Sequence, residues 1–437
     1  MRNITRRSFL KAAAAGAAIN NLGGTANLTG SLPAVLATPL VGDPVRYGFI
    51  GTGSRGNQLL QCLTTIPAGS CVATCDIYPV NLKKGVQTIG GSPQTYQDYR
   101  HLLERKDIDA VFIATPLHLH AQMVIDALEA GKHVFGEKTL FFKEEEWEPI
   151  RKAAAEHPKQ VLQVGLQRRS SVLYKVAMDM IRKGALGKIT FVRAQWHRNN
   201  SWRRPVADAQ LERLINWRMY RAYSGGLMAE LGSHQIDVVS WALGAEPISV
   251  MGTGGINYWK DGRETHDNVQ VIYEYPGGQK LLYSSILCNA HYDFNEQIMG
   301  DQGTLEITIG KGMYYHERVA KVSAGPAKEN WWAGATVTEK AAQKGFPIFP
   351  DQQGGEAGLV NRELEYGKRW LASMGIYAYH EPHDPTWTQL ENFFASIREG
   401  KPVAAPLEVG LADALGVIYA NRAIDTGQKV WWPQKRA

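Results

Sequence analysis

The sequence predicts an α/β chain with an N-terminal Rossmann dinucleotide-binding domain and a C-terminal α+β domain that has a large, open, mostly antiparallel sheet. Three observations support this. The chain has 437 residues, enough for two or three domains that each bury a core. Short apolar runs alternate with helical periods as far as about residue 165. From about residue 187 onward, apolar and polar residues alternate, as in strands with one exposed face.

The first 37 residues are typical of a twin-arginine signal peptide. Arg6 and Arg7 precede a weakly apolar run over residues 12–18, far shorter than the ~20 residues of a membrane span. We expect cleavage after Ala37, a linker to about residue 45 and a periplasmic or otherwise exported protein. A basic, unstructured N-terminus is the alternative interpretation.

Composition and charge narrow the classes of partner. Apolar residues make up 44% and charged residues 21%, as in ordinary globular proteins. The formal net charge of +6 includes four positive charges in the leader, so the rest is nearly balanced and we expect no nucleic-acid partner. Four cysteines are too few for a disulfide scaffold and lack the spacing of a zinc site. We expect no stable membrane span.

The predicted Rossmann domain covers residues 46–165. Its apolar, strand-like runs lie at 47–50, 71–76, 110–114, 133–136 and 161–165. Helical segments separate these runs, which indicates parallel strands joined by crossover helices.

Residues 166–437 form the predicted C-terminal domain, for substrate binding and oligomerisation. Strands are expected at 189–196, 269–275, 280–287 and 304–309. The stretch 311–385 has weak periodicity apart from a possible helix after Asn361, so it is expected to be a lid or an oligomer arm. Helices are expected from Thr386 and over 408–426, and they could pack back on the first domain.

A glycine-rich turn follows the first predicted strand and opens a helix. Its candidate cofactor residues are Gly51, Gly53, Ser54, Arg55 and Gly56. Such a turn brings backbone amides and a helix N-terminus to a pyrophosphate. Asp76 ends the next strand, 20 residues after Gly56, where a carboxylate accepts hydrogen bonds from ribose hydroxyls and disfavours the 2′-phosphate of NADP. The alternative is an ordinary tight turn.

Two further strand ends carry polar groups. Thr115, Pro116 and His120 follow one strand, and Glu137 and Lys138 follow the next. Ligands bind at this edge of open α/β sheets, so all five are candidates for cofactor contacts. A lysine there can also donate to a hydroxyl or carbonyl oxygen. Alternatively, His120 starts a helix without a catalytic role and Lys138 lies on the surface.

A third cluster contains Glu230, His234 and Asp237, which share one face of a predicted helix. Carboxylates one turn on either side of a histidine would raise its pKa and orient its ring, as suits a general base. Solvated ion pairs on a capped helix are an equal alternative. A metal site from these three residues is less favoured, and we expect no metal.

These motifs together resemble the Gfo/Idh/MocA oxidoreductase family, from about Arg46 to the C-terminus. The resemblance rests on the glycine turn, Thr115-Pro116 with His120, Glu137-Lys138, and Glu230-x-x-x-His234-x-x-Asp237. It implies hydride transfer between a nicotinamide and a ring carbon of a sugar or cyclitol, with Lys138 and His234 as the catalytic lysine and histidine. Thr139 stands where the family has proline, and Glu230 stands where aspartate is common.

Aromatic and basic residues between the catalytic motifs suggest a saccharide substrate, because aromatic faces stack on sugar rings while arginine and amide groups bind hydroxyls. The candidate substrate residues are Gln167, Arg168, Trp196, His197, Trp202 and Trp217. Trp331 and Trp332 could extend the site. The alternative places these aromatics in the core or at a dimer interface.

An exported enzyme has no replenished pool of free NAD, so we expect tightly bound NAD, with NADP disfavoured. The first hypothesis is oxidation of a sugar or glycoside hydroxyl, at C3 by family analogy, with return of the hydride to an acceptor. The second is an NAD-dependent glycosidase that oxidises transiently and then eliminates. The third is a non-catalytic sugar-binding protein. A homodimer or homotetramer is expected by resemblance.

Overall fold

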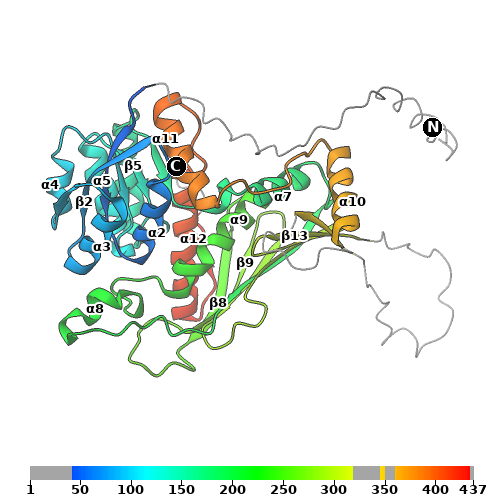
Figure 1. Cartoon of the computed structure of the whole chain (residues 1–437). Coiled ribbons are helices and arrows are strands. Elements are labelled where there is room, and N and C mark those ends of the chain that lie inside the picture. The colour runs from blue at the N-terminus through cyan, green and yellow to red at the C-terminus, as the bar shows by residue number, and fades with distance from the viewer. Residues whose placement is uncertain (1–41, 318–344, 350–359, 434–437) are drawn as a thin grey trace, which may run out of the picture. The chain divides into compact units, whose positions relative to one another are not determined.

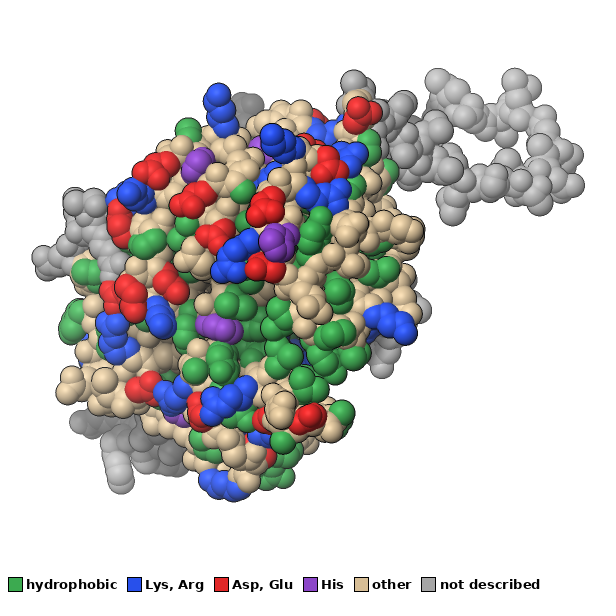
Figure 2. All heavy atoms as spheres, turned by 90° about the vertical axis from the view of Figure 1, so that its left-hand side faces the viewer, with side chains coloured by type: hydrophobic (Ala, Val, Ile, Leu, Met, Phe, Trp, Pro, Cys, Tyr) green, Lys and Arg blue, Asp and Glu red, His purple; other side chains and the backbone are tan. Residues whose placement is uncertain are grey.

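The computed structural model describes residues 42–317, 345–349 and 360–433. The predicted leader and the pair Trp331-Trp332 lie outside these residues. The described chain folds around two sheets, one of six strands and one of nine (Figure 1). On the face shown in Figure 2, acidic and basic side chains are interspersed and do not gather into one basic patch.

The six-stranded sheet is parallel, with the order β3-β2-β1-β4-β5-β6. Its strands are β1 Val45–Ile50, β2 Gly69–Cys75, β3 Gln94–Tyr96, β4 Ala110–Ile113, β5 His133–Gly136 and β6 Leu162–Val164. All four residues of β4 are buried, because helices cover both faces of the sheet. This is the Rossmann arrangement that the alternating apolar runs predicted.

Helices connect these strands and cover the sheet: α2 Ser54–Leu63, α3 Pro79–Ile89, α4 Tyr99–Leu103, α5 His120–Glu129 and α6 Trp147–Glu156. The strand order reverses between β1 and β4, so the chain leaves the two strands in opposite directions and opens a crevice at their carboxyl ends. Gly51, Ala114 and Glu137 directly follow β1, β4 and β5, and they stand at this edge.

The nine-stranded sheet has the order β14-β13-β12-β11-β7-β10-β9-β8-β15. Its strands are β7 Ile189–His197, β8 Ser249–Gly255, β9 Asn268–Glu274, β10 Lys280–Ile286, β11 Phe294–Gly300, β12 Gly303–Thr308, β13 Lys311–His316, β14 Phe346–Phe349 and β15 Val430–Trp431. In this nine-stranded sheet, β7 and β10 pair in parallel, and the other pairs of described strands are antiparallel. In β9, Val269, Val271 and Tyr273 are buried while Ile272 is partly exposed, as expected for a sheet with one open face.

The stretch 311–385 contains more regular structure than its sequence predicts. β13 and β14 extend the sheet, and α10 Val360–Ser373 packs against β14. Helical periodicity did indicate α10. Neither strand was predicted; β14 has four residues, Phe-Pro-Ile-Phe, which do not alternate between apolar and polar. A role of this stretch as a lid or oligomer arm stays a prediction.

The remaining helices include α7 Val172–Arg182, α8 Glu212–Ile215, α9 Ser233–Leu243, α11 Pro385–Glu399 and α12 Leu407–Thr426. Helix α12 contacts α9, β8 and also β6 of the six-stranded sheet, and α11 contacts α2 (Figure 1). Phe393 and Phe394 of α11 pack with Tyr47 and Phe112 in one apolar cluster. The C-terminal helices therefore complete the core of the N-terminal domain.

None of the helices in the described residues combines the length and the apolar character that a bilayer span needs. In the same residues, no three histidine, cysteine or acidic side chains come together as a metal site.

Candidate active site

A cleft of about 1030 Å³ runs along the carboxyl edge of the parallel strands and continues to β7 and the start of α9. It brings together most of the residues that the sequence singled out. The candidate residues that line it are Gly51, Gly53, Ser54, Arg55, Asp76, Thr115, Pro116, His120, Glu137, Lys138, Gln167, Trp196, Trp202, Trp217, Glu230 and His234. Gly56, Arg168, His197 and Asp237 are not part of its lining.

The glycine turn between β1 and α2 has the shape that a dinucleotide requires. Gly51 has φ of 90°, and a Cβ added there would lie 2.7 Å from the carbonyl oxygen of Ala114. A Cβ on Gly56 would lie 1.9 Å from the carbonyl oxygen of Gly51, so Gly56 lets α2 approach the turn. A Cβ added to Gly53 would lie 3.7 Å from its nearest neighbour, Nδ2 of Asn81, so the backbone at Gly53 is open to a ligand. These features fit a pyrophosphate at the α2 N-terminus.

Asp76 follows β2 and is held by the backbone. One carboxylate oxygen accepts hydrogen bonds from the amide of Thr52 at 2.8 Å, and the other accepts from the amide of Tyr78 at 2.8 Å. Burial nevertheless raises the pKa of this carboxyl above its usual range, because these hydrogen bonds only partly offset it. Asp76 lines the cleft, and its contact with a ribose stays a prediction.

Three residues join the other strand ends. His120 is buried, with Nδ1 2.8 Å from the carbonyl oxygen of Thr139 and Nε2 2.9 Å from that of Thr115. Its ring therefore bridges the loops after β4 and β5. Glu137 accepts a hydrogen bond from Nε of Arg55 at 2.8 Å. The Nη2 of Arg55 is buried and has no hydrogen-bond partner among the described residues, so it is a free donor at the cofactor end of the cleft.

Lys138 extends from the end of β5 toward the second sheet. Its Nζ donates to the carbonyl oxygens of Ala229 and Glu230, at 2.8 and 3.0 Å. An ammonium has three donors, so one remains for a ligand in the cleft. Burial lowers the pKa of Lys138, while the negative charges of Glu230 and Glu137 oppose that shift. The peptide bond between Lys138 and Thr139 is cis.

Glu230 lies in a π-helical turn, Met228–Gly232, that leads directly into α9. Its carboxylate accepts a hydrogen bond from Nε of Arg218 at 2.7 Å. Burial alone would raise the pKa of Glu230, but the positive charges of Arg218 and Lys138 outweigh burial and lower it. In the site, Glu230 is therefore an ionised carboxylate that is bound by Arg218.

His234 lines the same wall of the cleft, in the first turn of α9, with its ring centre 5.7 Å from that of Trp196. The expected increase of its pKa by flanking carboxylates is wrong. Burial, followed by the positive charges of Arg168 and Lys138, holds the pKa of His234 well below its usual range. The Nδ1 atom is buried and no described group hydrogen-bonds to it. His234 is thus a neutral imidazole.

Asp237 does not orient His234, in contrast to the expectation from their spacing. Both residues lie in α9, but Asp237 binds Arg169, which comes from outside the helix, with Nη2 to Oδ1 at 2.7 Å. The shared face therefore ends at His234. With Glu230 bound by Arg218 and Asp237 bound by Arg169, these residues do not form the metal site considered for them.

Arg168 and His197 also lie outside the cleft. Arg168 packs over the rings of Trp196 and Phe294 and pairs with the buried Glu296, with Nη1 to Oε1 at 3.3 Å. His197 is the next residue after Trp196 on β7, so it points to the opposite face of the sheet, where Nε2 lies 3.1 Å from the hydroxyl of Ser284. Both residues support the wall of the cleft from behind.

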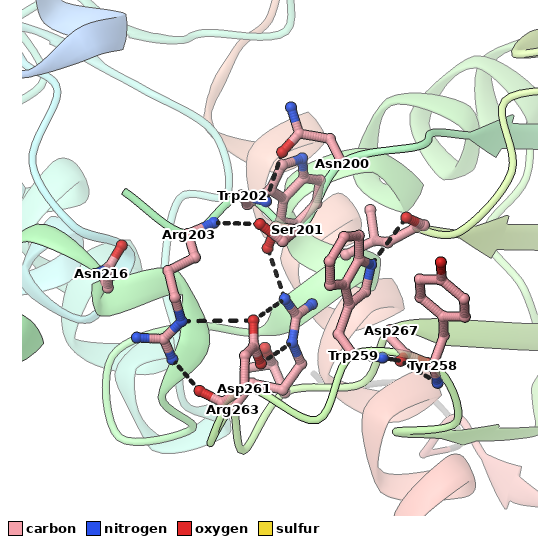
Figure 3. A network of polar contacts seen from close by, with 12 residues as sticks. Asn200, Ser201, Trp202, Arg203, Asn216, Tyr258, Trp259, Asp261, Arg263 and Asp267 are labelled. Atoms are coloured by element: carbon pink, nitrogen blue, oxygen red, sulfur yellow. Dashed lines mark hydrogen bonds and ion pairs between the residues drawn. The ribbon is translucent and has the colours of Figure 1, made fainter. Parts of the chain in front are cut away.

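The loop after β7 carries Trp202 and is held by a polar network that Figure 3 shows. Arg263 donates to the carbonyl oxygen of Ser201 at 2.7 Å and also binds Asp261. Arg203 pairs with Asp261, with Nε to Oδ2 at 3.4 Å, and with Glu212 on α8. These contacts fix the loop, so Trp202 is held at the cleft.

Several cleft residues were not predicted from sequence. Tyr78, His118, Arg204 and Tyr223 line the cleft as well. Arg198 and Arg218, which belong to the basic and aromatic segment that suggested a sugar site, also line it, and Arg204 lies in the same segment, so clustering is a signal that could have found it. Nothing in their spacing separates them from arginines that serve only the fold.

Comparison with known proteins was made for both parts of the chain. Residues 45–166 match the oxidoreductase family with the NAD-binding Rossmann fold of GFO/IDH/MocA proteins, and residues 174–306 match the GFO/IDH/MocA C-terminal domain. Glycosyl hydrolase family 109 protein 1 of Shewanella sp. (strain MR-4) is 30% identical over 243 residues, which cover 50% of this chain and 51% of the relative. The match thus spans about half the length of that relative.

Two solved structures show the same fold. Myo-inositol 2-dehydrogenase from Lactobacillus plantarum has a TM-score of 0.65 and 20% identity, over 89% of this chain and 99% of that chain. Aldose-aldose oxidoreductase from Caulobacter crescentus has a TM-score of 0.64 and 19% identity, over 89% of this chain and 100% of that chain. At these identities the comparison concerns the fold alone.

Proposed function

Since the chain belongs to the GFO/IDH/MocA family of oxidoreductases, we propose that it oxidises a hydroxyl group of a sugar or glycoside with a nicotinamide dinucleotide held in its Rossmann domain. One observation carries the proposal. Lys138 from β5 and His234 from α9 line a single cleft together with the glycine turn after β1. A substrate bound there would touch an ammonium and a neutral imidazole at once.

The two side chains have complementary roles. His234 accepts the hydroxyl proton, which its low pKa permits because the ring is neutral before the reaction. The remaining N–H of Lys138 donates to the same oxygen and stabilises the developing carbonyl. Two carbonyl oxygens already hold the lysine in place, so little reorganisation is needed. When bound, the nicotinamide dinucleotide supplies the acceptor for the hydride.

Gly51, Gly53 and the α2 N-terminus would hold the pyrophosphate, with Arg55 beside them, and Asp76 would hold the adenine ribose. The Asp76 carboxylate supports NAD over NADP, because a 2′-phosphate beside it would be repelled. We further propose that export through the twin-arginine pathway goes with a cofactor that stays bound, and that the product is a keto-sugar oxidised at C3. Denaturing the purified protein and assaying the released NAD(H) tests retention.

Replacement of the two catalytic side chains tests the oxidation directly. His234→Ala and Lys138→Ala are each expected to lower kcat by about 10²–10⁴-fold, the usual contribution of a positioned acid or base. His101→Ala, which alters an exposed histidine on α4, is the matched control and should keep wild-type turnover. Near wild-type turnover in both cleft variants would remove the assignment.

A second candidate function is an NAD-dependent glycosidase that cleaves the glycosidic bond after transient oxidation. The 30% identity to a glycosyl hydrolase family 109 protein favours it. Incubation with aryl glycosides, without added NAD, separates the two functions. Free aglycone indicates bond cleavage, whereas a keto-glycoside of unchanged connectivity indicates simple oxidation.

A further inference from the structure

Two of the arginines that line the cleft have no acidic partner. Arg55, Arg203, Arg213 and Arg218 each have a carboxylate within 4.0 Å, from Glu137, from Glu212 and Asp261, from Glu264 and from Glu230 respectively. Among the described residues, no carboxylate lies this close to Arg198 or Arg204. The cleft therefore has two arginines that no described carboxylate neutralises.

Arg198 packs on the tryptophan that contacts His234. Its guanidinium carbon is 4.9 Å from the centre of the Trp196 ring, whose centre is in turn 5.7 Å from that of His234. The positive charge of Arg198 contributes to the low pKa of His234, after the larger effects of burial, Arg168, Lys138 and Arg55. The Nε atom of Arg198 is buried and has no hydrogen-bond partner among the described groups, so this donor remains unsatisfied.

Arg204 is presented by a backbone that cannot easily move. Its amide donates to Oδ1 of Asn216 at 2.8 Å, and its carbonyl oxygen accepts from Nδ2 of the same residue at 2.9 Å. The network in Figure 3 holds the preceding residues Ser201 and Arg203 as well. Arg204 is an exposed residue, and desolvation together with the positive charge of Arg218 lowers its pKa. Arg218 is itself paired with Glu230, so Arg204 is the cation of these two that lacks an acidic partner among the described residues.

We propose that Arg198 and Arg204 bind an anionic substituent of the substrate, so that the preferred ligand is an acidic sugar bearing a carboxylate, sulfate or phosphate group. The planar guanidinium donates two parallel hydrogen bonds to such oxyanions, and a ligand anion would relieve the repulsion within the cleft. This inference deepens the proposed function and rests on it for the sugar part of the ligand.

Arg198 comes from the second sheet and not from the domain that is expected to hold the cofactor. It follows β7 and packs on Trp196, which contacts His234, whereas the dinucleotide is expected at the α2 N-terminus and Asp76. Arg55 already offers a free Nη2 at that end of the cleft. The cofactor phosphates therefore have their own donors.

Binding of matched sugars to the full chain loaded with NAD tests the inference. The probes are methyl glucoside and methyl galactoside, their uronate forms, their 6-sulfates and their 6-phosphates. Fluorescence of the cleft tryptophans reports binding at constant ionic strength, which removes general salt effects. We expect at least one anionic probe to bind about tenfold or more tightly than its neutral parent, and the three anion classes show which oxyanion is preferred.

Variants assign the preference to the two arginines. Arg198→Gln and Arg204→Gln should each reduce the preference, measured as the ratio of the Kd values of the neutral and the anionic probe, about tenfold. Arg193→Gln removes the same charge from an exposed position on β7 and should preserve the preference. Arg198→Lys keeps the positive charge and replaces the glutamine variant if that variant does not fold. It should retain only part of the preference for the anionic probe, because lysine lacks the planar guanidinium.

The inference fails if no anionic probe binds better than its neutral parent, or if the preference survives in both glutamine variants. Turnover measured on the same samples separates this failure from that of the proposed function. Oxidation of neutral sugars without anion preference would contradict only the inference. Arginine-dependent binding of acidic sugars without any oxidation would contradict only the proposed function.

Discussion

At the scale of single residues, the cleft relies on cations that are controlled by burial. His234 is neutral because its surroundings are apolar and positively charged, and Lys138 remains useful because two carbonyl oxygens and Glu230 hold it. The sequence identified both residues. It misjudged the pKa of His234, because helical spacing brings in carboxylates and does not reveal that arginines from other segments bind them.

The pH dependence of kcat/KM should reflect these shifts. The base must be neutral, and the pKa of His234 lies below its ordinary value of 6.5, so the acid limb should have its midpoint below pH 6.5. Lys138 must be protonated, and its pKa is lowered from 10.5, so the alkaline limb should lie below pH 10.5. An acid limb above pH 6.5 would contradict the role of His234.

Removal of the Glu230 charge should move the alkaline limb of the kcat/KM profile to lower pH. Glu230 opposes the effect of burial on Lys138, so Glu230→Gln lowers the lysine pKa and deprotonates it at lower pH. Glu145→Gln, on an exposed position of the same domain as Lys138, is the control and should leave the limb in place. An unchanged limb in Glu230→Gln would show that Lys138 is not the titrating acid.

At the scale of elements, substitutions at two glycines in the turn between β1 and α2 should affect cofactor binding and folding differently. Gly53→Ala has room for its Cβ and should keep the stability of the apoprotein while weakening NAD binding, because the methyl group occupies the open backbone surface. Gly56→Ala places Cβ 1.9 Å from the carbonyl oxygen of Gly51 and should also destabilise the fold. Calorimetry and NAD titration measure the two effects. Equal loss of stability in both variants would contradict the assignment.

Element prediction was most successful where the periodicity was long. The five runs of the Rossmann sheet and the helices α11 and α12 were located from apolar spacing. The π turn before α9 was not foreseen, since its residues are compatible with an ordinary helix. Glu230, within that turn, and His234, just after it, both line the cleft, whereas Asp237 further along α9 pairs with Arg169.

At the scale of the whole molecule, the first domain depends on residues from the end of the chain. Phe393 lies 5.3 Å from Phe112 and 5.9 Å from Phe135 between ring centres. Phe393→Ala should therefore reduce the free energy of unfolding by about 3–5 kcal/mol and weaken NAD binding with it. Tyr377→Ala alters a side chain that is 72% exposed and should cost at most about 0.5 kcal/mol. Urea denaturation measures the free energy of unfolding of both variants. Equal, small losses of stability in Phe393→Ala and Tyr377→Ala would contradict a core shared by α11 and the first domain.

Asp413 on α12 is a second feature of the assembled molecule. It is 2% exposed, neither carboxyl oxygen has a hydrogen-bond partner among the described residues, and burial together with the charge of Asp237 raises its pKa well above 3.8. Below pH 3.8 the folded and unfolded forms are both protonated. At higher pH the unfolded chain ionises first, so this residue makes the protein less stable as pH rises toward its folded-state pKa.

Asp413→Asn removes that ionisation and should be more stable than wild type near neutral pH. The difference in the free energy of unfolding between Asp413→Asn and the wild type should grow by up to about 1.4 kcal/mol per pH unit above pH 4. Thermal and urea unfolding at several pH values measure it. A difference that does not change with pH would show that Asp413 is not held protonated.

The sequence by itself determined the fold class, the glycine turn with Asp76, and the candidates Lys138 and His234, because each depends on local periodicity or short spacing. The tertiary structure decided which charges meet. It paired Asp237 with Arg169 and Glu230 with Arg218, and among the residues it describes it brought no carboxylate within 4.0 Å of Arg198 or Arg204. Electrostatic environment depends on groups that are distant in the chain and on burial, and neither can be obtained from spacing along the sequence.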